Sequence, residues 1–129
     1  MRILSIITAR GGSKKLPNKN ILKLKKKPLI AHTIFSSLKS NLIDKTIVST
    51  DSPKIAHISK KYGANIPFLR PKKLAGDKSH SPEVVEHAVS FLEKNQNEYY
   101  DIILMLQPTS PFRTQKHLDA AIRKFLKEK

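Results

Sequence analysis

The sequence contains no cysteine. Disulfides and thiolate metal sites are therefore excluded, and the redox compartment stays open. Long apolar runs are also missing, because only a few apolar residues lie between Arg2 and Arg10 and no later run is longer. Such runs are too short for the core of a signal peptide or for a membrane span. We therefore expect a cytoplasmic protein without a membrane segment, folded as a single domain over residues 1–129.

Acidic side chains are absent from the first third of the chain. The first is Asp44, and ten basic residues precede it. Over the whole chain, 25 basic and 10 acidic residues give a formal net charge of +15. A field of this sign attracts polyanions such as a nucleoside triphosphate, an acidic sugar or a nucleic acid, and charge alone does not choose among them. The lysines at positions 23–27 are expected to form a solvated loop.

Two common glycine patterns for phosphate binding are missing as well. Neither the Walker spacing nor the dinucleotide fingerprint occurs. Instead, the apolar run at 3–8, which we interpret as a buried strand, is followed by Gly11-Gly12. Glycine adopts backbone angles closed to other residues, so consecutive N–H groups can converge on an anion. Three cations surround the pair and favour a polyphosphate over a simple tight turn: Arg10, Lys14 and Lys19.

The apolar spacing predicts strands that alternate with helices. The expected strands cover residues 3–8, 45–50, 64–69 and 101–106, and the expected helices begin near Pro28, Pro53, Pro82 and Thr114. Ser52 and Ser81 are placed to cap their helices, and Gly63 suits the left-handed position after a helix. Residues 102–106 are all apolar, which is typical of a central parallel strand covered on both faces. The pattern predicts an α/β fold with an open, mainly parallel sheet and flanking helices.

In sheets of this kind, ligands bind beyond the carboxyl ends of the strands. If the first and last strands are neighbours, residues 10–20 and 107–113 form two walls of one crevice. Asp51, Arg70 and the segment that leads to Ser81 are expected at the same edge. We expect Asp51 to fix its loop rather than to bind a metal. The five histidines have no metal-ligand spacing and are interpreted as surface or helix residues.

Several ordered motifs run along essentially the whole chain. They are Ala9-Arg10-Gly11-Gly12-Ser13-Lys14, Leu16-Pro17-Asn18-Lys19-Asn20, Val48-Ser49-Thr50-Asp51, Leu69-Arg70-Pro71, Leu74-Ala75 with Asp77, and Leu106-Gln107-Pro108-Thr109-Ser110-Pro111. In these motifs the chain resembles the acylneuraminate cytidylyltransferases, or CMP-sialic acid synthetases, whose relatives act on legionaminic and pseudaminic acids. The resemblance implies a Rossmann-like fold of the nucleotide-diphospho-sugar transferase type, incomplete at the carboxyl terminus.

The resemblance also implies a reaction. CTP and a nine-carbon 2-keto sugar acid would give the CMP-sugar and pyrophosphate, assisted by Mg²⁺. The residues expected to hold the phosphates and ribose are Arg10, Gly11, Gly12, Ser13, Lys14, Lys19 and Asn20, and those expected to contact the nucleotide are Arg70, Ser79, Ser81 and Gln107, the last near the base. For three of these a plainer role stays open: the stem of Arg70 could cover apolar surface, Ser81 could only cap a helix, and Gln107 could cap a strand edge.

The chain departs from the family pattern in two ways. Lys15 and Lys26 stand where the family usually or often has glycine. Family members also continue into a dimerisation and sugar-binding region and a late pair of aspartates that hold Mg²⁺, and this chain ends before them. No catalytic base or metal ligand is therefore named, and the homodimer of the family is not carried over. CTP should bind, whereas turnover by this chain should be weak or absent.

Three alternatives stay open. Another nucleotidyltransferase, such as one that activates 3-deoxy-manno-octulosonate, is disfavoured by the motif at 107–111. A basic nucleic-acid-binding module would interleave aromatic residues with its cations, and no aromatic residue precedes Phe35. A remnant that pairs with a full-length subunit and does no chemistry is the third.

Overall fold

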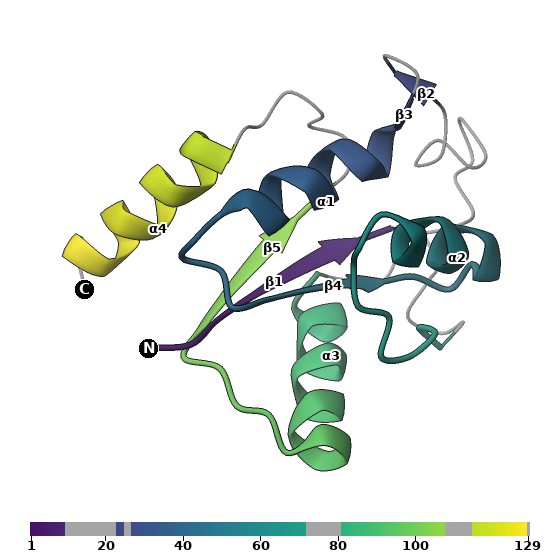
Figure 1. Cartoon of the computed structure of the whole chain (residues 1–129). Helices are drawn as coiled ribbons and strands as arrows, with labels where there is room; N and C mark the ends of the chain where they lie inside the picture. Colours follow the sequence, from purple (N-terminus) through teal and green to yellow (C-terminus); the bar gives the residue numbers. More distant parts are fainter. Residues whose placement is uncertain (10–22, 25–26, 72–80, 108–114, 129) are drawn as a thin grey trace.

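The computed structural model describes residues 1–9, 23–24, 27–71, 81–107 and 115–128. Its centre is a parallel sheet with the strand order β4-β1-β5 (Figure 1). These strands are β1 (Ile3–Thr8), β4 (Lys45–Ser49) and β5 (Ile102–Leu106). The predicted α/β class with a parallel sheet is confirmed.

The central strand of the described sheet is β1, and the prediction that residues 102–106 would be central is wrong. In β1, Ile6 pairs with Ile47 on one side and with Met105 on the other. Five of the six residues of β1 are buried, whereas the three middle residues of β5 are half-buried. An apolar run therefore occurs in both places, and it does not by itself distinguish a central strand from an outer one.

Helices cover both faces of the sheet (Figure 1). They are α1 (Leu29–Lys39), α2 (Pro53–Lys61), α3 (Ser81–Gln96) and α4 (Gln115–Glu128). Because side chains alternate along a strand, β1 supplies both cores. Ile7 packs in a cluster with residues of α1, α2 and α4, whereas Leu4 and Ile6 pack in a cluster with Ala88 and Leu92 of α3.

The ends of α2 form as the sequence predicts. Ser52 precedes the helix, and its Oγ accepts a hydrogen bond from the Ile55 amide at 3.2 Å. Gly63 has a φ of +102°, and a Cβ at this position would lie 2.9 Å from Cδ1 of Leu38. The backbone angle therefore favours glycine here, whereas the exposed end of Leu38 could move to admit a Cβ.

The lysine run contains a pair of two-residue strands, and its expected exposure to solvent stays a prediction. Strand β2 (Lys23–Leu24) pairs antiparallel with β3 (Lys27–Pro28), and α1 begins directly afterwards. Proline suits this last position because the amide that it lacks would have no partner inside the first turn of the helix.

The predicted strand at 64–69 is wrong in its length. The described structure has a single parallel bridge there, at Asn65. The Asn65 amide donates to the Thr46 carbonyl and the Val48 amide donates to the Asn65 carbonyl, each at 3.0 Å. The next bond of a parallel ladder would require an N–H from Pro67, which has none. The segment therefore follows the edge of β4 without continuing the sheet.

Charged groups stabilise the end of the sheet at which the strands begin. Lys45 Nζ lies 2.9 Å from Oε1 of Glu98, and the Tyr100 hydroxyl donates to the same oxygen at 2.7 Å. The Arg2 guanidinium lies over the Tyr100 ring, 4.6 Å from its centroid. The hydrogen bond from Lys45 lowers the pKa of Glu98 below its ordinary value of 4.5, and burial raises the pKa of Tyr100 to about 12.

We expect Glu98→Gln to remove part of the acid sensitivity of the fold. Because the folded pKa of Glu98 is depressed, its contribution to stability is present above about pH 4.5 and is lost as the pH falls through the folded pKa. This contribution is about 1 kcal/mol, as expected for a partly exposed ion pair. Urea unfolding at pH 7 and pH 3 would measure it, with Glu128→Gln, an exposed acid, as the control. An equal loss of stability between the two pH values in wild type and Glu98→Gln would contradict the prediction.

Candidate nucleotide site

The carboxyl ends of the three strands meet at one edge. The first and last predicted strands are neighbours, which was the condition for a shared crevice, because Ile7 lies opposite Leu106. On the other side Thr8 lies opposite Ser49, and the Ala9 amide donates to the Ser49 carbonyl at 3.0 Å. The backbone that leads into residues 10–20 is thus fixed to the end of β4. This is the edge at which an open parallel sheet binds ligands.

Arg70 lies buried at this edge, with 4% of its surface exposed. Its backbone amide donates to the Thr50 carbonyl at 2.7 Å, directly beyond the end of β4. Its Nε donates to Ser49 Oγ at 3.0 Å and its Nη2 to the Ser49 carbonyl at 2.6 Å. The guanidinium is therefore oriented by defined hydrogen bonds. A side chain whose stem only covers apolar surface would not require them. A cation held in this way is suited to phosphate oxygens.

The turn between β4 and α2 is held by hydroxyl groups. Thr50 Oγ1 accepts from the Ser52 amide at 3.1 Å, and Ser52 in turn caps α2. Thr50 is fully buried, and Asp51 is half-buried between the two hydroxyl residues. Thr50 and Ser52 thus supply the two side-chain hydrogen bonds described above for this turn. The expected role of Asp51 stays a prediction.

The structure describes only some of the other predicted site residues. Gln107 directly follows β5 at the same edge and is exposed. Ser81 is the first residue of α3, and its side chain lies outside the described part of the chain. The remaining predicted residues lie outside the described ranges: Arg10, Gly11, Gly12, Ser13, Lys14, Lys19, Asn20 and Ser79. Their roles stay predictions.

Sequence reasoning assigned no role to Ser49 and Thr50. Both belong to a motif noted above, and both are fully buried in the structure. A signal was available, because two small hydroxyl residues that end an apolar strand ahead of a turn must find hydrogen-bond partners once they are buried. The identity of the partner, Arg70, depends on the fold and could not be read from the sequence.

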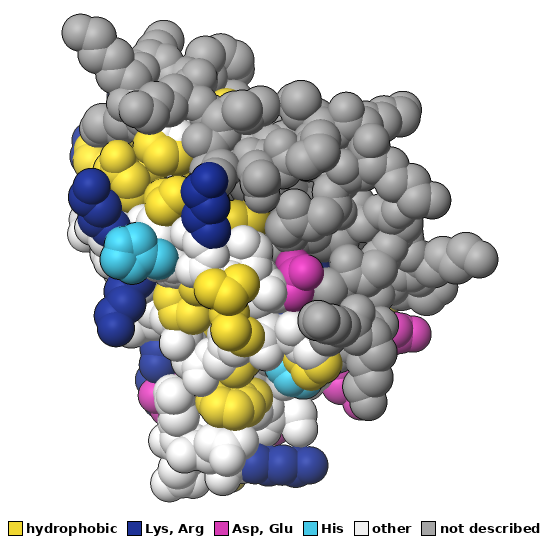
Figure 2. All heavy atoms as spheres, turned by 90° about the vertical axis from the view of Figure 1, so that its right-hand side faces the viewer, with side chains coloured by type: hydrophobic (Ala, Val, Ile, Leu, Met, Phe, Trp, Pro, Cys, Tyr) yellow, Lys and Arg dark blue, Asp and Glu magenta, His cyan; other side chains and the backbone are white. Residues whose placement is uncertain are grey.

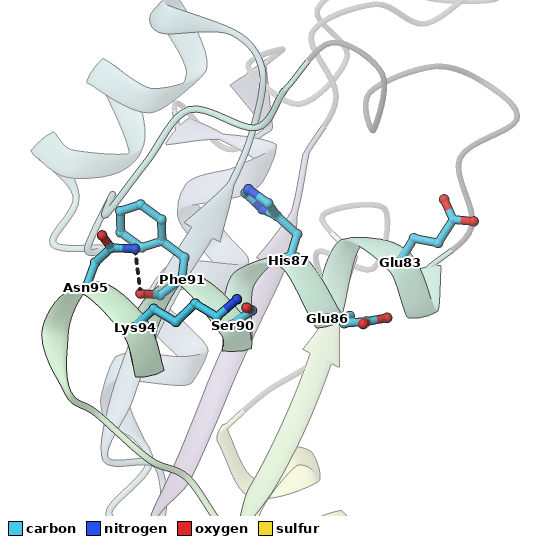
Figure 3. Close-up of a pocket in the computed structure, with 7 residues that line it drawn as sticks. All are labelled: Glu83, Glu86, His87, Ser90, Phe91, Lys94 and Asn95. Atoms are coloured by element: carbon cyan, nitrogen blue, oxygen red, sulfur yellow. Dashed lines mark hydrogen bonds between the residues drawn. The ribbon is translucent and has the colours of Figure 1, made fainter.

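A separate groove of about 490 Å³ runs along α3. Its described lining comes entirely from this helix and includes Glu86, His87 and Phe91 (Figure 3). The His87 ring stands edge-on to Phe68, with the ring centroids 4.6 Å apart. Of the predicted nucleotide contacts that the structure describes, neither Arg70 nor Gln107 lines this groove, and the carboxyl edge of the sheet stays the candidate nucleotide site.

The described surface beside α2 carries no continuous basic patch. Figure 2 shows hydrophobic side chains in a broken band down the middle of this face, with separate basic side chains beside them. A surface that binds nucleic acid through its phosphates would join such cations into a stripe. This face leaves the nucleic-acid alternative untested, because residues 10–22 and 25–26, which hold many of the cations, lie outside the described ranges.

No helix within the described ranges is both long enough and apolar enough to cross a membrane. No group of three or more His, Cys, Asp or Glu side chains that could hold a metal ion occurs there either.

Known proteins resemble this chain in sequence. A 46% identity over 124 residues relates it to the CMP-N,N'-diacetyllegionaminic acid synthase of Legionella pneumophila, with 95% of this chain and 52% of the relative covered. The pseudaminic acid cytidylyltransferase of Campylobacter jejuni is 40% identical, with 98% and 54% covered. The N-acylneuraminate cytidylyltransferase of Escherichia coli is 45% identical, with 95% and 28% covered. The chain thus spans about half or less of the length of these relatives.

The fold is also that of solved cytidylyltransferases. The structure of a CMP:2-keto-3-deoxy-manno-octonic acid synthetase complexed with CTP matches with a TM-score of 0.80 at 20% identity, over 98% of this chain and 48% of that chain. A 4-diphosphocytidyl-2C-methyl-D-erythritol synthase matches with a TM-score of 0.70 at 16% identity, over 95% and 53%. At these identities the likeness concerns the fold alone. The sequence pattern of the family described as cytidylyltransferase matches residues 4–129, and the chain therefore belongs to that family.

Proposed function

We propose that this chain forms the CTP-binding part of an enzyme that transfers CMP to an acidic nine-carbon 2-keto sugar. The observation that carries the proposal is the guanidinium of Arg70, buried at the carboxyl edge and oriented by Ser49. The names of the relatives support the sugar class, because those at 40–46% identity act on legionaminic, pseudaminic or acylneuraminic acids. The likeness to the octonic acid synthetase, at 20% identity, supports only the fold.

The proposed reaction is an in-line transfer. The anomeric hydroxyl of the sugar attacks the α-phosphorus of CTP, the bond to pyrophosphate breaks, and the hydroxyl proton leaves to a base. The protein mainly positions the reactants and neutralises charge in such a reaction. We assign the phosphates to Arg70 and to the predicted loop at 10–20. Gln107 is assigned to the base, because it follows β5 at the same edge and its side chain is exposed.

Magnesium and the sugar remain proposals. Mg²⁺ usually binds through one or two carboxylates together with substrate phosphates. Since the described residues contain no group of three or more potential ligands, we derive no step through the metal. We place the activity in the cytoplasm, where CTP is made. We also expect turnover and sugar binding to need more protein than the half of each relative that this chain spans.

Selective binding of CTP is the expected result of a calorimetric titration. The 129-residue chain would be titrated with CTP, ATP, GTP and UTP, each with and without Mg²⁺. The triphosphate is common to all four, so selectivity for CTP must come from contacts to the base. Equal heat for all four nucleotides would contradict the proposal, as would steep salt-dependent RNA binding without a preference for CTP.

A further inference from the structure

We propose that Ser49 is a positioning residue that sets the orientation of the Arg70 guanidinium for the nucleotide. The inference rests on the proposed function and adds to it a residue that would not itself touch the ligand. Ser49 lies at the carboxyl end of β4 and is fully buried. Its action on the nucleotide would therefore pass through Arg70.

Two acceptors of Ser49 hold two different nitrogens of one guanidinium. The hydroxyl oxygen accepts from Nε at 3.0 Å and the carbonyl oxygen accepts from Nη2 at 2.6 Å. A guanidinium is planar, and hydrogen bonds at two of its nitrogens restrict both its position and its rotation about the side-chain torsions. The amide of Arg70 also bonds the carbonyl of Thr50, so the backbone from which the side chain starts is fixed as well.

The same carbonyl of Ser49 also accepts a hydrogen bond from the residue that follows β1. It accepts from the Ala9 amide at 3.0 Å, and Ala9 is the last described residue before the predicted phosphate loop. One backbone oxygen thus joins the end of β1 and the Arg70 guanidinium.

The hydroxyl can be removed without removing the carbonyl. Ser49→Ala leaves the bonds from Ala9 and from Nη2 in place and deletes only the acceptor of Nε. The guanidinium then has one fewer fixed point and a wider range of orientations. Since this bond is present without nucleotide, its own strength largely cancels in binding, and the loss of affinity comes from ordering the freer guanidinium, which corresponds to about tenfold.

A double-mutant cycle on the full 129-residue chain tests the inference. CTP affinity is measured for wild type, Ser49→Ala, Arg70→Ala and the double variant. We expect Ser49→Ala to lose about tenfold in affinity in the wild-type background and less than about twofold in the Arg70→Ala background, because residues that act as a unit are not additive. Equal losses in both backgrounds, or no loss in either, would overturn the inference. A purely structural role would give equal losses.

Two further variants control for general effects of the substitution and for a loss of folding. Ser5→Ala is the matched control, because Ser5 is a fully buried serine of β1 whose hydroxyl has no hydrogen-bond partner within the described part of the chain. It should leave CTP affinity unchanged. Should Ser49→Ala not fold, Ser49→Cys keeps the shape but offers only a weak sulfur acceptor. A folded Ser49→Cys with wild-type affinity would overturn the inference.

A measurement without nucleotide separates this inference from the proposed function. The exchange of the Arg70 Nε–H with solvent can be followed by nitrogen-15 NMR on the nucleotide-free chain. We expect faster exchange in Ser49→Ala than in wild type and in Ser5→Ala. Unchanged exchange would overturn the positioning role even if CTP binds. Faster exchange in a chain that binds no CTP would instead refute the proposed function and leave the Ser49–Arg70 contact standing.

Discussion

Replacing Asp119 with alanine is expected to lower the free energy of unfolding by about 2 kcal/mol. This carboxylate lies on α4 with 5% of its surface exposed. Its Oδ1 accepts from the hydroxyl of Ser40, which directly follows α1, and its Oδ2 accepts from Nε2 of Gln115. The Ser40 hydroxyl also accepts from the Leu42 amide at 3.1 Å. Removing the carboxylate thus leaves the buried hydroxyl of Ser40 and the half-buried amide of Gln115 without this acceptor.

Urea unfolding followed by circular dichroism would measure this loss. Glu128→Ala, which removes an exposed acid near the end of the same helix, should change the unfolding free energy by less than about 0.5 kcal/mol. Asp119→Asn keeps the size of the side chain and one carbonyl acceptor, so it should lose less than Asp119→Ala. If Asp119→Ala and Glu128→Ala unfold at the same urea concentration, the buried network does not fasten α4.

Arg70→Ala is expected to weaken CTP binding by about a hundredfold. A guanidinium that contacts a triphosphate makes charge-assisted hydrogen bonds, and the loss of two such bonds corresponds to about this factor. The change also leaves the hydroxyl of Ser49 without the Nε donor that it now has. Calorimetric titration with CTP would measure the effect at a temperature where thermal unfolding shows the variant to be folded.

The control for this substitution removes an equal charge elsewhere. Arg123→Ala deletes an exposed guanidinium on α4. It lowers the net charge by the same amount as Arg70→Ala, so any general attraction of the basic chain for the nucleotide falls equally in both. We expect Arg123→Ala to change CTP affinity by less than about twofold. Similar losses for the two variants would mean that Arg70 has no specific contact with CTP.

Local patterns predicted most of the fold. The start of α2 follows from Ser52-Pro53, because the hydroxyl cap and the fixed φ of proline act within one turn. Its end follows from Gly63, since few other residues adopt a φ of +102°. The alternation of such helices with apolar runs sufficed to predict a parallel sheet, because neighbouring parallel strands need crossover connections.

Features that depend on neighbours distant in sequence could not be predicted in the same way. The order of the strands decides which apolar run is central, and both β1 and β5 have the composition of a central strand. Pro67 was a signal in the sequence against a continuous strand at 64–69, because proline donates no hydrogen bond to a β-ladder, but the prediction did not take it into account. Of the candidate site, Arg70 was predicted as a nucleotide contact, whereas its partner Ser49 became visible only in the structure.

Strand β4 carries the Lys45–Glu98 ion pair at one end and the Ser49–Arg70 contact at the other. With a rise of about 3.3 Å per residue, its four steps separate the two by about 13 Å. This distance exceeds the Debye length of about 8 Å at physiological ionic strength. Since the Lys45–Glu98 pair is also partly exposed to solvent, titration of Glu98 at this distance changes the field at a phosphate beside Arg70 only modestly. Acid tolerance and nucleotide affinity can consequently change independently, through substitutions at opposite ends of one short strand.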